Sequence, residues 1–312
     1  MTYEEDEYDC IKYLENSIYI ENFNTLRGIF RKRLDQGAAS SEIKFTTHDY
    51  STHCKNIYKI ISETVVDFSK KPSKKTIFLL DVAVLLHDIV MADNTELRET
   101  HAKDGQMFVL DAIYSNDRNE INSVLDASSA KIIASAIYGH GNIKNNVGVK
   151  VNTLEELYKK YEHTKTDDDK LACQIGAALR LADELDSTVD RINRPQNEYH
   201  FNENLEKDRL SKSHHMKLVL VDKIYKDPEK NDQLKIATND YYFEKNGFND
   251  DLGEMILEVK NKIIKELECI NSYISHKIDG CFYRIFHSVE IETYNSDMQI
   301  YLDHPKKKIK KY

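Results

Sequence analysis

The chain has 312 residues, of which 40% are hydrophobic and 31% charged, and it carries a formal net charge of −9 at pH 7. It has only ten glycines and four prolines. This low content excludes a collagen-like or linker-dominated chain and argues against a sandwich or barrel throughout. It favours long helices. The negative charge argues against broad capture of nucleic acid or of an anionic membrane. No apolar run reaches the roughly 18 residues that indicate a transmembrane helix.

The cysteines and the N-terminus indicate the compartment. Five cysteines, an odd number without a CxxC pair, favour reduced thiols over a disulfide framework or a cysteine zinc site. The first ten residues, MTYEEDEYDC, are acidic where a secretory leader would be basic. We therefore expect a cytoplasmic protein.

Apolar residues at helical spacing dominate the first two thirds of the chain. The first such stretch ends at Gly37, in a run of small polar residues. The most apolar stretch, TIFLLDVAVLLHDIVM (76–91), follows the loop 70–75 and is predicted to be a helix buried in a core. Further helices are predicted over 53–68, 96–115, 128–138, 153–162 and 168–187.

The pattern changes after about residue 196. Residues 216–225 and 233–243 are rich in strand-forming residues and are joined by a turn-rich loop, which predicts a hairpin. A long helix over 250–276 and a second hairpin around NSD (295–297) are predicted to follow. The fold class is therefore mainly α, with three parts: an N-terminal helical extension (1–44), a helical domain (45–196), and a small α+β unit of order ββαββ with a basic tail (197–312).

A few histidines and aspartates on otherwise apolar helices are the candidates for chemistry. His87 and Asp88 end the run VAVLLHDIV, where burying both is costly unless each is satisfied, and a metal ion satisfies both at once. His53 begins the preceding amphipathic helix, and Asp183 lies in the apolar sequence GAALRLADELDS. This mixed nitrogen and oxygen set suits a first-row divalent metal or Mg²⁺.

The ordered set resembles the HD superfamily of metal-dependent phosphohydrolases, whose core pattern is H…HD…D on a helical bundle. HAKDG (101–105), with His101, looks like the HxxxG segment of the HD-GYP-type branch, and YGHG, with His140, looks like that branch's later histidine. The resemblance implies that these two histidines hold a second metal in binuclear members. The GYP tripeptide is missing, so cyclic di-GMP is not supported as a substrate. FTTHDYSTH and ALRLADELDST look closer to the HD-CE type, and the similarity covers about residues 45–195 and, more loosely, the α+β tail.

The resemblance implies a phosphohydrolase or phosphodiesterase that hydrolyses a nucleotide or other small phosphoester with a metal-activated water. One or two ions would be bound, with Mn, Mg, Fe, Ni, Co and Zn all allowed. Asp88 would ligate the metal and orient the water, and His101 or His140 would either ligate metal or donate a proton to the phosphate. His48 belongs to a second HD dipeptide, in a polar turn, and is expected to contact substrate. The cations expected to neutralise the phosphate are Lys103, Lys144, Arg180 and Arg191.

Structural alternatives stand beside these assignments. His87 and Asp88 could form a buried hydrogen-bonded pair that only ends a helix. Asp183 could pair with Arg180, three residues earlier on the same helix. Asp186, three residues after Asp183, is expected to face solvent or to form an ion pair and is not assigned as a ligand.

Two functions of other classes also remain open. The first is a regulatory module that binds a nucleotide or a partner protein through the α+β tail, and a homo-oligomer is allowed in either case. The second is a nuclease on single-stranded nucleic acid, which would need a basic groove that the composition does not indicate. Neither GxxxxGK[ST], GxSxG nor HExxH occurs in the chain, which argues against a P-loop protein, a serine hydrolase of the elbow type and the common zinc protease.

Overall fold

The computed structural model describes residues 8–40, 48–92, 99–114, 121–144, 148–191 and 215–303, without the side chains of 38–40. The chain divides into two compact units. Unit 1 contains residues 1–186 and 266–285, and unit 2 contains residues 187–265 and 286–312. The division therefore falls ten residues before the predicted boundary at 196, and a C-terminal segment returns to the first unit.

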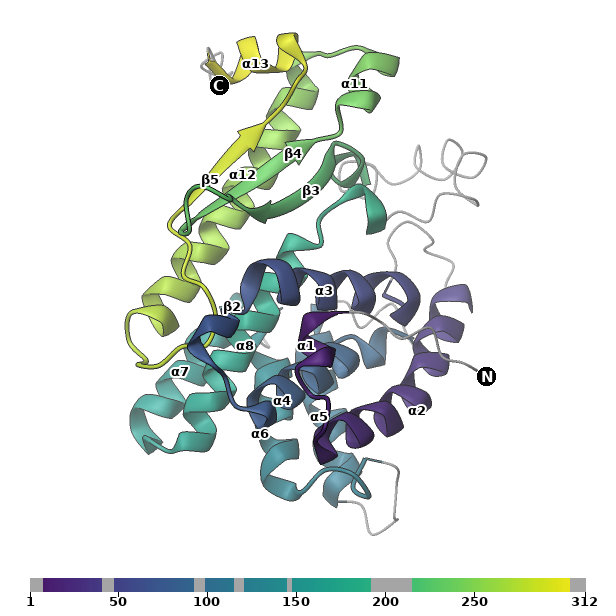
Figure 1. Cartoon of the computed structure of the whole chain (residues 1–312), viewed down its shortest axis with the longest axis vertical. Helices are drawn as coiled ribbons and strands as arrows, with labels where there is room; N and C mark the ends of the chain where they lie inside the picture. The colour runs from purple at the N-terminus through teal and green to yellow at the C-terminus, as the bar shows by residue number, and fades with distance from the viewer. Residues whose placement is uncertain are drawn as a thin grey trace. The chain divides into compact units, whose positions relative to one another are not determined.

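The described part of unit 1 is mainly helical (Figure 1). Its β-structure is one short hairpin and an isolated bridge between Val66 and Tyr283. Strands β1 (Asn142–Lys144) and β2 (Lys150–Asn152) pair antiparallel, and this hairpin was not predicted. The helices of unit 1 are α1 (Asp9–Lys12), α2 (Ile18–Ser40), α3 (Lys55–Ile60), α4 (Lys74–Leu86), α5 (His101–Tyr114), α6 (Ala127–Gly139), α7 (Thr153–Thr164) and α8 (Asp167–Leu185).

Helices α4 and α6 lie at the centre of unit 1. Every residue of α4 from Ile77 to Leu86 is buried, as its apolar sequence predicts. Helix α6 packs against α4, α5, α7 and α8. Side-chain caps begin these helices, because the Ser73 hydroxyl accepts the Thr76 amide hydrogen at 3.0 Å and the Asp126 carboxylate accepts that of Ser129 at 2.8 Å. In the part of the chain that the structure describes, no helix has the length and apolar character needed to cross a bilayer.

Two predicted helix ends in unit 1 are wrong. Helix α2 does not end at Gly37 but continues to Ser40. Gly37 is a point of close packing, because a Cβ built on it would lie 2.2 Å from the carbonyl oxygen of Ala92. The apolar helix is also shorter than predicted, since α4 ends at Leu86 and a 3₁₀ turn, Ile89–Ala92, follows. His87 and Asp88 therefore directly follow α4, at the helix end where they were predicted to lie.

Unit 2 contains a three-stranded sheet in which β4 (Gln233–Thr238) lies between β3 (Val221–Lys226) and β5 (Ser288–Glu292) (Figure 1). The predicted first hairpin is confirmed, because β3 and β4 pair antiparallel. Both strands are shorter than predicted, since residues 215–219 are helical and a further helix begins at Asp240. Strand β5 pairs with β4 in parallel, and the chain between them contains α11 (Asp240–Asn246) and α12 (Asp250–Ile270), whose last residues belong to unit 1.

The predicted second hairpin is wrong. Its second strand is instead helix α13 (Ser296–Asp303). The Asn295 side chain accepts the Met298 amide hydrogen at 2.9 Å and thereby starts a helix where the sequence suggested a turn between strands. From β3 onward, the described order in unit 2 is therefore ββααβα, and the fold as a whole is mainly α, as predicted.

Candidate metal centre

His53 lies on a helical segment that starts one turn earlier than predicted. A π-helical turn, Tyr50–Cys54, leads into α3, and a second one, Ile61–Val65, follows it. The Asp49 carboxylate caps this segment by accepting the Thr52 amide hydrogen. The HD dipeptide at 48–49 thus lies in a turn, as expected, and its aspartate has a structural role.

His53, His87, Asp88 and Asp183 converge although they come from three separate parts of the chain. The Nε2 atoms of His53 and His87 are 3.2 Å apart. Asp183 Oδ1 lies 3.3 Å from His53 Nε2 and 3.9 Å from His87 Nε2. Asp88 Oδ2 lies 3.5 Å and 3.4 Å from the same two nitrogens. Four donors at about 2.1 Å around one ion would be about 3.4 Å apart in a tetrahedron, so these separations fit a first-row divalent ion.

The ring nitrogens of His53 and His87 explain why a cation is needed between them. His87 Nδ1 donates to the Val84 carbonyl oxygen at 2.8 Å, and His53 Nδ1 lies 2.6 Å from Asp186 Oδ2. Because each Nδ1 carries the hydrogen, the neutral rings direct Nε2 lone pairs at each other. Both side chains are fully buried, so this arrangement is stable only with a proton or a metal ion between the nitrogens.

A second group of donors shares Asp88. His101, on the first turn of α5, and His140, directly after α6, place their Nε2 atoms 3.1 Å apart. Asp88 Oδ1 lies 3.8 Å from His101 Nε2, and Asp88, His101 and His140 are close enough to ligate one ion. Asp88 therefore offers one oxygen to each group, which fits two ions bound side by side. All six residues assigned to metal binding from the sequence are brought together.

Gly105 and Gly141 allow the approach of His101 to this site. A Cβ on Gly105 would lie 3.2 Å from the His87 carbonyl oxygen, and one on Gly141 would lie 3.0 Å from the Ala102 Cβ. Both contacts are tighter than side chains ordinarily make. The glycine of HAKDG thus lets α5 pack close to the end of α4.

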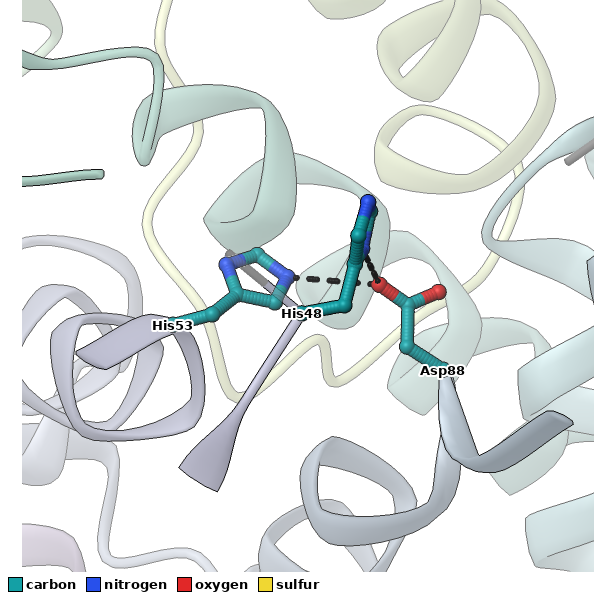
Figure 2. A group of neighbouring side chains, drawn as sticks. All are labelled: His48, His53 and Asp88. Atoms are coloured by element: carbon teal, nitrogen blue, oxygen red, sulfur yellow. Dashed lines mark hydrogen bonds and ion pairs between the residues drawn. The ribbon is translucent and has the colours of Figure 1, made fainter. Parts of the chain in front are cut away.

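His48 is part of the same cluster. Its Nδ1 lies 2.6 Å from Asp88 Oδ2, and Figure 2 shows its ring and that of His53 directed at this one oxygen. With His53 and Asp88 it forms a third group that could hold an ion. Unlike His53, it is partly exposed, with 21% of its side chain accessible.

The sequence model of one family, HD-CE, matches residues 42–267. The chain belongs to the HD-CE family. No curated protein and no solved structure matched the chain. The match contains all of the converging histidines and aspartates.

Charges within the HD-CE site favour ligation. Burial raises the pKa of Asp88, but the neighbouring His87 and His48 outweigh it and hold this pKa well below the ordinary value. Burial lowers the pKa of His87, whereas the Asp88 carboxylate raises it, with a net rise. Burial, together with the charges of His101 and His87, lowers the pKa of His140 to about 3. At neutral pH, Asp88 is thus ionised and His140 neutral, which are the forms that bind metals, whereas the raised pKa of His87 means that a metal ion would have to displace a proton there.

Arg180 does not pair with Asp183. It is buried, and its Nε donates to Glu266 Oε2 at 2.6 Å, while Nη1 donates to the Gly141 carbonyl oxygen and to Asn152 Oδ1, each at 3.0 Å. These acceptors hold the turn that follows His140. The described contacts of Arg180 thus favour a role at this turn, and its contact with the substrate stays a prediction.

The other predicted cations have varied surroundings. Lys144 forms an exposed ion pair with Glu99, and Lys103 is exposed on the first turn of α5. Arg191 lies in the 3₁₀ turn Val189–Arg191 of unit 2. Lys103 and Lys144 therefore stay predictions for phosphate contact, and the described geometry does not bear on Arg191.

The HD-CE site contains one residue whose role sequence reasoning missed. Asp186 is 1% exposed and contacts the His53 ring. We expected it to face solvent or to form an ion pair, and the sequence did not indicate that its partner would be a histidine of the site. The available signal was its spacing, since a residue three after Asp183 lies on the same side of a helix.

Proposed function

We propose that this protein is a metal-dependent phosphohydrolase that cleaves a nucleotide or another small phosphoester or phosphodiester. The observation that supports this most is the pair of facing Nε2 atoms of His53 and His87, flanked by the Asp88 and Asp183 carboxylates. Membership of the HD-CE family supports phosphate chemistry at such a site.

The donor set fits one or two divalent ions. His53, His87, Asp88 and Asp183 would hold the first, and Asp88, His101 and His140 the second. Bound there, a divalent ion lowers the pKa of a water molecule and polarises a phosphoryl oxygen. Mn²⁺, Mg²⁺, Fe²⁺, Ni²⁺, Co²⁺ and Zn²⁺ are all compatible with nitrogen and oxygen donors.

Residues of the chain would position the reactants. Asp88, ionised and fixed by His48, would orient the attacking water through a carboxylate oxygen. His48, partly exposed beside Asp88, would donate a hydrogen bond to the phosphate. Lys103 and Lys144 would neutralise the remaining phosphate charge. A small anionic substrate agrees with a net charge of −9, because local cations rather than the overall field attract it.

The proposed function also bears on where the protein acts and on what it binds. A nucleotide substrate and reduced cysteines favour the cytoplasm. A partner protein or a second copy of the chain would dock on unit 2, the α+β unit. A nucleic-acid substrate is not favoured, given the negative charge.

The test is metal analysis followed by a hydrolysis screen. Purified protein is first analysed for bound metals. It is then assayed with added Mn²⁺, Mg²⁺, Ni²⁺ or Co²⁺ for phosphate release from nucleotides. Nitrophenol release from bis(4-nitrophenyl) phosphate is measured under the same conditions. Asp88→Ala is expected to lose both metal content and turnover, because it removes an oxygen donor from both groups. Asp111→Ala, at an exposed position of α5, is the matched control and is expected to behave as wild type.

Two outcomes would contradict the proposal in different ways. If Asp88→Ala kept the wild-type metal content, the assignment of the metal site would be wrong. If the wild-type protein held metal and hydrolysed nothing across the screen, a regulatory module that binds a nucleotide or a protein would replace the enzyme.

A further inference from the structure

Asp186 and His53 form a close contact between a carboxylate and a ring nitrogen, and both side chains are buried. Asp186 Oδ2 lies 2.6 Å from His53 Nδ1. His53 is 0% and Asp186 1% exposed, so water does not compete for either group. A hydrogen bond to an ionised carboxylate is about twice as strong as one between neutral groups.

This contact fixes which nitrogen of His53 carries the hydrogen. A carboxylate only accepts hydrogen bonds, so Nδ1 must donate. The lone pair of the neutral ring then lies on Nε2, the atom 3.2 Å from His87 Nε2 and 3.3 Å from Asp183 Oδ1. The opposite tautomer would place a hydrogen on Nε2 and prevent it from binding a metal.

The last turn of α8 supplies carboxylates to both nitrogens of this one ring. Asp183 faces Nε2, and Asp186, the residue that ends the helix, faces Nδ1. The Asp186 amide donates to the Asp183 carbonyl oxygen at 3.2 Å, which sets the spacing between the two. By contrast, the Nδ1 atoms of His87 and His140 donate to backbone carbonyl oxygens, of Val84 and Ile137.

We propose that Asp186 is a positioning residue that holds His53 in the Nδ1–H tautomer and raises the basicity of its Nε2 as a ligand. The expected loss of metal affinity rests on the proposed function, whereas the expected tautomer of His53 does not depend on it. Replacing a carboxylate that orients a metal-binding histidine weakens metal affinity by about 10–100-fold, and we expect Asp186→Asn to fall in this range.

The first measurement concerns the protein without added metal. Long-range ¹H–¹⁵N correlation spectra report the tautomer of each histidine, and His53→Gln identifies the signals of His53. We expect the Nδ1–H tautomer in the wild type and a rise in the Nε2–H form in Asp186→Asn, whose amide can accept or donate. Asp186→Ala, which removes the acceptor altogether, should show a larger rise, and Asp111→Asn should show none.

The second measurement is a Co²⁺ titration followed by visible absorption. Asp186→Asn is expected to bind Co²⁺ about 10–100-fold more weakly than the wild type and with a shifted spectrum, because the ligand field of His53 changes. Asp111→Asn is expected to match the wild type in both. Circular dichroism confirms that each variant is folded, so a loss of affinity is not a loss of structure.

The outcomes separate this inference from the proposed function. A wild-type His53 in the Nε2–H tautomer would overturn the inference without any variant. Unchanged tautomer and Co²⁺ affinity in both Asp186 variants would overturn it while leaving the metal site intact. If the wild type bound no metal but its tautomer changed on substitution, the positioning role would stand and the proposed function would fail.

Discussion

A buried carboxyl group is not by itself a sign of a metal site in this protein. Asp81 lies in the middle of α4, is fully buried, and is not among the converging donors. Burial raises its pKa well above the ordinary value, and the Cys10 thiol lowers it only in part. A raised pKa of an acid means that the neutral form is favoured in the folded state.

Asp81 should make the protein less stable at alkaline pH. Its contribution is fully present below the ordinary pKa of aspartate and is lost as pH rises through the higher pKa of the folded state. Asp81→Asn cannot ionise, so it should be more stable than the wild type at pH 8, by on the order of 1–3 kcal/mol, and the gain should shrink towards pH 4. Urea unfolding at several pH values measures this, with Asp111→Asn as the exposed control. The same pH dependence in Asp81→Asn and wild type would contradict the assignment.

The convergence of the candidate ligands was predictable because their order along the chain matches a family pattern and because a histidine or aspartate in an apolar helix stands out. Asp186 was not predictable in the same way. Its position, directly after α8, looks exposed in a pattern of alternating acidic and apolar residues, and only the fold brings His53, 133 positions away, against it. The roles of acidic residues depend on such long-range contacts, which a single sequence does not contain.

At the scale of elements, glycine placement explains why the first helix is longer than predicted. A glycine was taken as the end of the first helix, but in α2 both Gly28 and Gly37 are internal. The first has no atom within 4 Å of a Cβ built on it, whereas the second meets the backbone of Ala92. A glycine that admits a neighbouring backbone and one that breaks a helix look alike in sequence.

The two glycines of α2 should therefore respond oppositely to alanine. Gly28→Ala is expected to stabilise the protein by about 0.5–1 kcal/mol, because alanine has the higher helix propensity and the space is open. Gly37→Ala should destabilise it by about 1–3 kcal/mol, because the added methyl group overlaps the carbonyl oxygen of Ala92. Thermal unfolding of both variants tests this, and equal melting temperatures would mean that α2 is not held against Ala92.

The strands of unit 2 show where hydrophobic periodicity predicts secondary structure and where it fails. The β-rich pattern correctly predicted the hairpin of β3 and β4, since alternation and a turn-rich loop agree there. The same pattern failed for α13. The five residues MQIYL in this helix mix apolar and polar side chains in a way that fits either a short strand or one face of a helix. The Asn295 cap decides between them, and a cap is a weak signal when the helix is short.

At the scale of the whole molecule, the first unit is closed by a segment from near the end of the chain. Glu266 pairs with the buried Arg180, Arg284 donates to the Thr64 carbonyl oxygen at 2.9 Å, and Tyr283 forms a β-bridge with Val66. A boundary drawn at 196 from composition misses these contacts, because composition does not report which segments return.

Removal of the Glu266 carboxylate should therefore destabilise unit 1. Arg180 is 6% exposed in its side chain, and leaving a buried charge without its partner costs on the order of 3 kcal/mol. Glu266→Ala is expected to lower the melting temperature clearly, whereas Glu268→Ala, at an exposed position two residues further along α12, should not. If the two variants had the same melting temperature, the acceptors in the turn after His140 would have to suffice for the buried charge of Arg180.

If the proposed metal site is occupied, the convergence of donors from residue 53 to residue 183 couples the folding of the chain to the concentration of metal ions around it. These residues meet only when unit 1 is folded, so any ion that they bind favours the folded chain over the unfolded one. At a free ion concentration 100 times the dissociation constant this amounts to about 2.7 kcal/mol, a sizeable part of the net stability of an ordinary domain. The abundance of folded protein would then follow the free ion concentration in the cell, even when no substrate is present.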